Sequence, residues 1–336
     1  MSANSAPLTT TIDDLPVAIH LVPLPTPFPV GPVNCYILLG DPLTIVDPGM
    51  LWGDNMQVLA DALVRHGRRL DDIEQIVVTH GHPDHFGAAG WVAEQSSATV
   101  ICGRLDAPKL VGGAGRAGSA SRSTDLTVRL GLPDSLHAMF AKFYEGVTAL
   151  THPIPDGQLR LLDDGDTLEA GGRTWHVHVT PGHSVGHVSL YDPSDRTLLS
   201  GDHLLACITP NPVLEPEPDE PDGRRRSLVE YLASLDRFVR LDPLRVLPGH
   251  GPCFRDVLVL VDETRRHHET RATEIFHIVE SLGESTPYEL SRALFPHLED
   301  FTVMLGVSEA VGHLDLLEAD GRIRRVSDHP QRNAIA

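Results

Sequence analysis

The sequence predicts a protein of the α/β class with a smaller, helix-rich unit at its C-terminal end. Short apolar runs typical of buried strands recur along the first 250 residues, and helical patterns separate several of them. Several of these runs lead into glycine and then histidine or aspartate, an arrangement that places polar side chains along one edge of the sheets. Beyond about residue 255 helical patterns dominate, which indicates a second unit.

The amino-acid composition is typical of an ordinary globular protein. The chain has 336 residues, enough for one large domain and one small one, and 41% of them are hydrophobic. No apolar run approaches the length of a membrane span, and residues 1–11 lack the basic start and apolar core of a signal peptide. The four cysteines are scattered without a CxxC pair, which suits reduced thiols. We therefore expect a cytoplasmic protein.

The net charge of the chain limits the substrates and partners that we expect for it. The formal net charge is −19. Proteins that bind nucleic acid generally present a basic face to the phosphates, so this charge disfavours a polyanionic substrate. We expect a small-molecule substrate, without a nucleic acid or a membrane as partner.

The first 100 residues alternate strands and helices. Residues 1–14 look disordered, and the turn Gly40-Asp41-Pro42 separates two strands within residues 34–46. A helix is expected at 54–66, with Gly67 as its stop. It is followed by a strand at 76–78, a helix near 87–94 and a strand at 98–102.

The segment after the strand at 76–78 carries the densest group of potential metal ligands. Four such side chains lie within six residues: His80, His82, Asp84 and His85. Glycine and proline between them turn the chain, so the four groups can point into one volume. Imidazole and carboxylate at this density suit Zn²⁺ or another borderline divalent metal.

Three later segments repeat the order strand, glycine, ligand. They lie at 175–183, 197–202 and 245–250, and their candidate ligands are His183, Asp202 and His250. An earlier apolar run, 43–46, ends in Asp47 in the same way.

Together these residues resemble the metal-binding motifs of the metallo-β-lactamase-fold hydrolases. The resemblance lies in His80-x-His82-x-Asp84-His85 followed by His183, Asp202 and His250, with Asp47 ahead of them. Order and approximate spacing agree from about residue 20 to 255. The resemblance implies an αββα sandwich over residues 15–256. The chain after about residue 260 resembles the small winged-helix domain of one branch of these hydrolases, which we place at 257–328.

Carried over residue by residue, the resemblance implies two metal ions, which we expect to be Zn²⁺, with Fe or Mn as alternatives. His80, His82 and His183 would hold the first ion. Asp84, His85 and His250 would hold the second, and Asp202 would bridge the two. Asp47 would orient ligands by hydrogen bonds.

The residue at 202 separates the branches of this family. True β-lactamases of this fold carry Cys or His there, whereas glyoxalase-II-like thioesterases, lactonases and nucleases carry Asp. Asp202 therefore favours hydrolysis of an ester, thioester or lactone, and a metal-dependent endoribonuclease or phosphodiesterase is the alternative. A redox metalloprotein is less expected, because flavo-di-iron relatives usually have Glu where this chain has His82.

The expected chemistry uses a hydroxide held between two metal ions, which attacks the substrate at neutral pH. Asp84 could take the proton of the bridging water in addition to its ligand role. His187 and His203 lie near the motifs but outside the ligand set, and we expect His187 to support the ligands or the fold. We expect His267 and His268, in the tail, to be exposed.

Residues 104–150 interrupt the alternation of strands and helices. Loop-like stretches lead to a helical pattern at 130–144. The segment is either a surface insertion or a cap over the metals that selects the substrate, and we expect the cap. Thr209-Pro210-Asn211, just past Asp202, forms a second candidate wall of the site.

The sequence of the tail, from residue 257 onwards, predicts three helices and a hairpin. A helix is expected at 257–282, a second at 290–295 behind the capping sequence Thr286-Pro287-Tyr288-Glu289, a third at 307–319 and a hairpin strand at 323–326. From residue 260 onwards there are eight Arg and no Lys against fourteen Asp plus Glu. We therefore expect the tail to pack against the hydrolase domain, or to form a homodimer, and not to bind nucleic acid.

Overall fold

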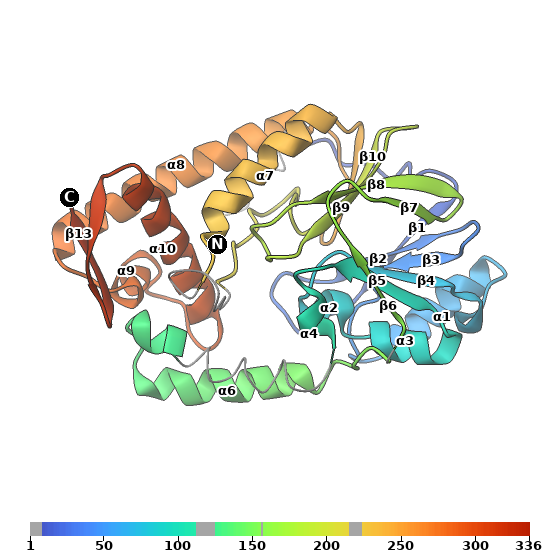
Figure 1. Cartoon of the computed structure of the whole chain (residues 1–336), viewed down its shortest axis with the longest axis horizontal. Coiled ribbons are helices and arrows are strands. Elements are labelled where there is room, and N and C mark those ends of the chain that lie inside the picture. The colour runs from blue at the N-terminus through green and yellow to red at the C-terminus, as the bar shows by residue number, and fades with distance from the viewer. Residues whose placement is uncertain (1–8, 112–124, 156, 215–223) are drawn as a thin grey trace.

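The computed structural model describes residues 9–111, 125–155, 157–214 and 224–336. Two sheets face each other, and helices cover their outer faces (Figure 1). The first sheet contains, in order, β1 (Ile19–Leu24), β2 (Val33–Leu38), β3 (Thr44–Val46), β4 (Gln75–Val78), β5 (Thr99–Gly103) and β6 (Leu159–Leu162). The second contains β11 (Arg245–Pro248), β10 (Thr197–Gly201), β9 (Val188–Asp192), β8 (Arg173–Val179) and β7 (Thr167–Ala170).

Three apolar layers hold this sandwich together. Trp175, Leu190 and Val77 belong to the layer between the sheets. The helices α1 (Asn55–Arg65) and α3 (Ala89–Ser96) pack on the outer face of the first sheet, where η1 (Leu70–Asp72) also lies. The helix α7 (Ser227–Leu241) and the start of α8 (Val257–Leu282) cover the second sheet. This layering confirms the predicted αββα sandwich.

The described residues of the 104–150 insertion connect the sandwich and the C-terminal unit. They include α4 (Ala107–Leu110) and α6 (Asp134–Thr148), and α6 runs along the edge of the molecule towards the C-terminal unit (Figure 1). Phe140 of α6 lies in one apolar cluster with Val303 and Val307 of the C-terminal unit. The helix begins at 134 and not at 130, because Pro133 disfavours a helical conformation for the residue before it.

The C-terminal unit has the element order that the tail pattern predicts. It comprises the rest of α8, then α9 (Pro287–Leu294), α10 (Thr302–Ala319), β12 (Ile323–Asp328) and β13 (Gln331–Ile335). Thr286 Oγ1 accepts from Glu289 N at 3.1 Å, and Thr286 N donates to Glu289 Oε2 at 2.8 Å, which forms the expected capping box. The description of this unit as a winged helix remains a prediction.

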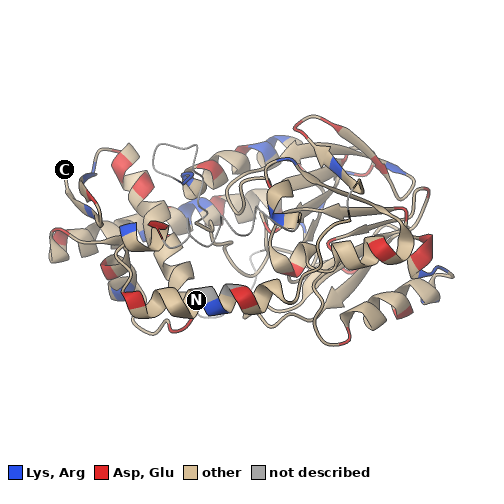
Figure 2. Ribbon diagram, turned by 60° about the horizontal axis from the view of Figure 1, so that its bottom comes forward, with Lys and Arg blue, Asp and Glu red and all other residues tan. Residues whose placement is uncertain are grey.

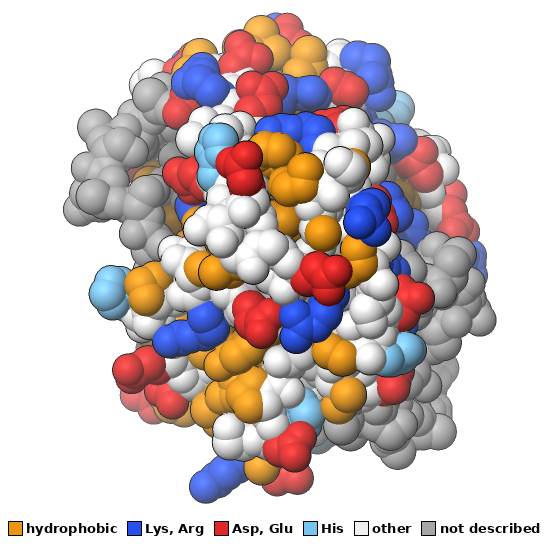
Figure 3. Space-filling model, turned by 90° about the vertical axis from the view of Figure 1, so that its left-hand side faces the viewer, with side chains coloured by type: hydrophobic (Ala, Val, Ile, Leu, Met, Phe, Trp, Pro, Cys, Tyr) orange, Lys and Arg blue, Asp and Glu red, His pale blue; other side chains and the backbone are white. Residues whose placement is uncertain are grey.

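The C-terminal unit packs against the rest of the chain, as expected for the tail. The guanidinium of Arg224 donates to both carboxylate oxygens of Asp315 in α10, at 2.6 and 2.7 Å, and both side chains are 2% exposed. A buried bidentate pair of this kind fixes the orientation of the two groups. Figure 2 shows acidic and basic residues interspersed over this unit. On its end face, apolar side chains lie in separate groups between charged ones (Figure 3).

The N-terminal segment differs from the expectation of disorder over residues 1–14. Residues 1–8 lie outside the described part of the chain. The following residues are placed, because Ile12 N donates to Cys253 O at 2.9 Å and the Ile12 and Leu15 side chains pack on the core between the sheets. Among the described residues, no helix is long and apolar enough to cross a membrane.

Candidate metal centre

β4 brings the first candidate ligands to one end of the first sheet. Pro83 starts α2 (Pro83–Phe86), and His82 is its N-cap in extended conformation. Proline suits the first helical position because its missing N–H has no partner there in any case. The turn places His80 Nε2 at 2.9 Å from His82 Nδ1 and puts Asp84 and His85 on the short helix.

The loops after β8, β10 and β11 bring the remaining candidates to the same place. Asp202 follows β10 directly, and its Oδ1 lies 3.4 Å from His85 Nε2. Its Oδ2 lies 3.5 Å from the Nε2 atoms of both His183 and His250. Asp202 therefore lies within reach of residues from both expected ligand groups.

All seven candidate ligands come together in one buried cluster. They form three overlapping groups, in each of which the ligand atoms lie within 4.8 Å of one another: His80, His82 and His183; Asp84, His85 and His250; and His80, His85 and Asp202. Six of the seven side chains are buried and His82 is partly buried.

Asp47 and Thr79 form hydrogen bonds with His80 and His85, one histidine from each ligand group. Asp47 Oδ2 accepts from Thr79 Oγ1 at 2.7 Å and from His85 Nδ1 at 2.9 Å. Since Thr79 Oγ1 donates to Asp47, it accepts from His80 Nδ1, which lies 3.1 Å away. Both imidazoles thus donate from Nδ1 and direct Nε2 into the cluster, which is the orientation that hydrogen-bond partners give to metal-binding histidines. The sequence indicated Asp47 but not Thr79.

Backbone carbonyls fix two further imidazoles in the same way. His183 Nδ1 donates to the carbonyl of Asn211 at 2.9 Å, and His250 Nδ1 donates to the carbonyl of Pro32 at 2.8 Å. In both cases Nε2 is left to face the cluster. His183 Nε2 is buried and has no hydrogen-bond partner among the described residues.

Asp106 is a buried residue of this site that sequence reasoning missed. It lies in the insertion, and its carboxylate accepts from Gly81 N at 2.8 Å, Ser184 Oγ at 2.6 Å and Gly186 N at 3.0 Å. It therefore joins the loop of His80 to the loop of His183. No local pattern marks it, because its partners lie 25 and about 80 residues away.

His187 and His203 lie behind the cluster. The His187 ring stacks on that of His80 with centroids 5.2 Å apart, and its Nδ1 lies 2.9 Å from Thr180 Oγ1. The His203 ring stacks on Tyr231 at 4.5 Å, and its Nε2 lies 3.3 Å from the Tyr231 carbonyl. Neither residue belongs to a ligand group.

The protonation states of His80, His183 and Asp202 are those that a divalent metal requires. Burial lowers the pKa of His80 well below its ordinary value, and the neighbouring imidazoles lower it further. Burial also lowers the pKa of His183, to about 4. Burial alone would raise the pKa of Asp202, but His250 and His85 outweigh it and hold that pKa well below its usual range. Neutral imidazoles and ionised carboxylates are the forms that bind metal.

The space at the centre of the cluster also fits a bound ion. A Cβ on Gly249 would lie 2.1 Å from Asp202 Oδ1 and 2.8 Å from His85 Cε1, so only glycine fits at this position of the loop after β11.

Despite burial, Asp202 and Asp47 raise the pKa of His85 above its ordinary value, which means that the metal-free cluster keeps a positive charge on an imidazole. A divalent cation supplies that charge instead.

A second group of potential ligands lies between α8 and α10 and consists of His267, His268 and Glu309. The expectation that both histidines are exposed is wrong for His268, which is 1% exposed and has its Nδ1 at 3.1 Å from His313 Nε2. The apolar contact of α8 with α10 buries it. Arg271 Nε lies 3.5 Å from Glu309 Oε1 and already supplies the counter-charge, so we assign no metal to this group.

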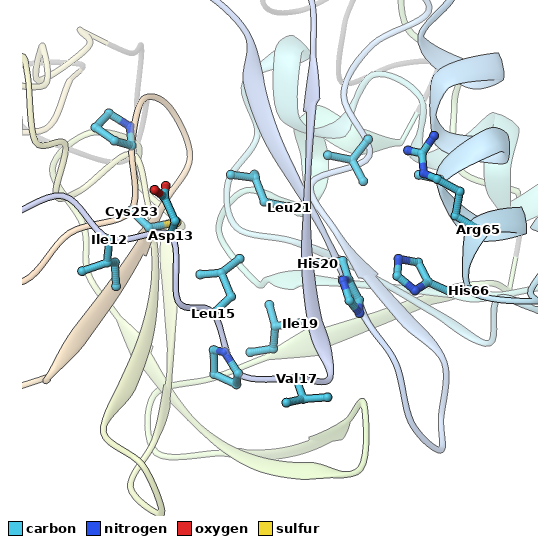
Figure 4. A pocket seen from close by; sticks show the side chains of 14 residues that line it. Ile12, Asp13, Leu15, Val17, Ile19, His20, Leu21, Arg65, His66 and Cys253 are labelled. Atoms are coloured by element: carbon cyan, nitrogen blue, oxygen red, sulfur yellow. The ribbon is translucent and has the colours of Figure 1, made fainter.

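A surface pocket of about 500 Å³ lies elsewhere, between the N-terminal segment, β1 and α1 (Figure 4). Leu15 and Ile19 line it towards the sheets, and His20 and His66 lie at the side of α1 with ring centroids 3.7 Å apart. None of the seven candidate ligands lines this pocket, so it is separate from the cluster.

The chain belongs to the metallo-beta-lactamase superfamily, whose family model matches residues 28–250. All seven candidate ligands lie within the matched stretch. The chain is 32% identical over 306 residues to the probable metallo-hydrolase YqjP of Bacillus subtilis (strain 168), a match that covers 89% of this chain and 92% of the relative. It is 26% identical over 273 residues to the Beta-lactamase-like protein 2 homolog of Caenorhabditis elegans, covering 81% and 73%.

Two solved structures share the architecture over nearly the whole length. A metallo-beta-lactamase family protein from Thermus thermophilus is 28% identical with a TM-score of 0.80, covering 95% of this chain and 99% of that one. A beta-lactamase domain protein from Burkholderia ambifaria is also 28% identical, with a TM-score of 0.81 and coverage of 99% and 97%. The similarity therefore includes the C-terminal unit. The chain is a metallo-hydrolase of this superfamily with a candidate His/Asp metal site.

Proposed function

We propose that this metallo-hydrolase binds two zinc ions and cleaves a small ester, thioester or lactone. The observation that carries the proposal is the position of Asp202. One of its oxygens lies 3.4 Å from His85 and the other 3.5 Å from both His183 and His250, so one carboxylate serves both ligand groups. A carboxylate in this position could contact both ions of a two-metal site.

The seven residues divide between the two ions. His80, His82 and His183 would hold one, Asp84, His85 and His250 the other, and Asp202 would bridge them. Imidazole and carboxylate ligands suit zinc, and Fe and Mn accept the same set. When bound, such a pair supplies a water nucleophile at neutral pH and stabilises negative charge on the substrate.

Asp84 is the proposed proton acceptor. His85 and His250 outweigh burial and lower its pKa, so its carboxylate is ionised at neutral pH. Its Oδ2 lies 3.3 Å from His250 Nε2, inside the cluster, where an attacking water would also have to lie. The role of Asp84 as general base follows from this position and charge.

The net charge supports a small-molecule substrate over a polyanion. The net charge of −19 opposes a polyanion, and arginines in and beside the C-terminal unit pair with acidic residues: Arg325 of β12 and Arg226, just before α7, both pair with Glu318 of α10. Phe143 of α6 stacks on Phe301 with centroids 4.4 Å apart, and Phe28 lies 6.5 Å from each ring. We propose that α6 acts as the cap and is held at Phe143 by the rings of Phe301 and Phe28.

The test is a substrate screen of the zinc-loaded protein against Asp202→Ala. Nitrophenyl esters, acyl thioesters and lactones form one set, and a nitrophenyl phosphodiester and single-stranded RNA form the other. Turnover of the first set that is lost in Asp202→Ala supports the proposal. Turnover confined to the second set would contradict the substrate class and favour the phosphodiesterase alternative.

A further inference from the structure

We infer that the C-terminal helix α10 positions His183 through Asn211, which makes the C-terminal unit part of the metal-binding apparatus. The inference rests on the proposed role of His183 as a metal ligand. It assigns Asn211 as a positioning residue, which acts on the metal through another side chain.

The first contact joins Asn211 to the imidazole. The carbonyl of Asn211 accepts from His183 Nδ1 at 2.9 Å. This bond holds the ring in one orientation and places its proton on Nδ1, so that Nε2 carries the free electron pair. Nε2 lies 3.5 Å from Asp202 Oδ2. A shift of Asn211 would therefore turn the ligand nitrogen away from Asp202.

The second contact joins Asn211 to α10. Its side-chain Nδ2 donates to the carbonyl of Leu305, in the first turn of α10, at 2.9 Å. A carbonyl only accepts, so the amide nitrogen and not the amide oxygen must face Leu305. Asn211 is thus held by its side chain on α10 while its backbone holds His183.

A neighbouring residue docks the same loop on α10. Leu214 N donates to Ser308 Oγ at 3.2 Å, and the Leu214 side chain lies in the apolar cluster with Val303 and Val311. The loop that follows Asp202 therefore lies on α10 at two points. Only the point at Asn211 continues to a candidate ligand, and this difference provides a matched control.

The experiment compares Asn211→Ala and Asn211→Asp with the control Ser308→Ala in the full-length protein. Each change removes one hydrogen bond between the loop and α10, but Ser308→Ala leaves Asn211 in place. Zinc affinity is measured by competition with a chromophoric chelator, and the melting temperature of the metal-free protein is measured in parallel. Loss of the hydrogen-bond partner of a metal ligand typically weakens metal binding about 10- to 100-fold. The Asn211 variants keep the carbonyl that accepts from His183 and remove only its anchor on α10, so the lower end of this range applies. We expect about a tenfold loss at one of the two ions in both Asn211 variants and no loss in Ser308→Ala.

The outcomes separate this inference from the proposed function. Wild-type protein that binds fewer than two zinc ions would contradict the binuclear site itself. The positioning role alone would be overturned by a different result: the wild-type protein binds two ions, and the Asn211 variants bind zinc as tightly as Ser308→Ala does. If Asn211→Ala lowers the metal-free melting temperature more than Ser308→Ala does, Asn211→Leu serves in its place, because leucine keeps the side-chain size without a donor. Zinc affinity equal to wild type in that variant also overturns the inference.

Discussion

Gly249 offers a way to disturb Asp202 without replacing any candidate ligand. An added Cβ would lie 2.1 Å from Asp202 Oδ1, whereas an ordinary contact begins at 3.4 Å, so the two groups must separate by about 1.3 Å. Metal–ligand distances tolerate deviations of about 0.2 Å. Gly249→Ala should therefore displace the Asp202 carboxylate beyond the reach of the proposed metal ions. We expect a loss of zinc affinity of at least about 100-fold, the upper end of the range for second-layer changes.

The control for this variant is Gly251→Ala in the same loop. Gly251 has a φ of +74°, but a Cβ there meets no atom within 4 Å. Its replacement costs about 1–2 kcal/mol of stability from the left-handed backbone and should leave metal content unchanged. Zinc per chain is measured after gel filtration in a weak chelator. Two tightly held ions in Gly249→Ala would refute the claim that Asp202 lies between the metals.

Three further predictions concern the site and its surroundings. Asp202→Ala should lose both ions and all hydrolysis, whereas His203→Ala should keep its metal content; equal losses would show that the bridge is misassigned. Asp106→Ala should lower zinc affinity and activity together, about 10- to 100-fold, because two ligand loops lose their common acceptor, and wild-type affinity would contradict that role. Burial lowers the pKa of His313 to about 4, while an unfolded imidazole titrates near 6.5. As the pH falls, the unfolded chain therefore takes up the proton first. The stability that neutral His313 contributes above pH 6.5 is lost towards pH 4, by up to about 1.4 kcal/mol per pH unit. In urea melts of the metal-free protein, His313→Gln should reduce the dependence of unfolding free energy on pH, and an unchanged dependence would contradict this role of His313.

The candidate ligands were predictable from the sequence because each one lies in a short segment that follows a strand. Such positions are local, since an apolar run, a glycine and a histidine or aspartate are all visible within about eight residues. Strand ends meet at one edge of the sandwich, so His80, Asp202 and His250 converge although they are far apart in the chain. The capping box at Thr286 was predictable for the same local reason.

The parts that escaped prediction depend on contacts between distant segments. Asp106 looks like any loop aspartate until the loops of His80 and His183 fold against it. The sequence indicated Asn211 as part of a wall of the site, but its link to α10, 94 residues away, leaves no local signal. Buried His268 belongs to a helix whose charged composition suggested exposure, and the packing of α10 against that helix reverses it.

The central claim is that two ions share Asp202, and an anomalous-scattering crystal structure of the zinc-loaded protein tests it most directly. We predict two zinc peaks about 3.5–4 Å apart, with the Asp202 carboxylate between them, His80, His82 and His183 around one, and Asp84, His85 and His250 around the other. A single peak in the cluster, or a second ion held at His267, His268 and Glu309, would contradict it.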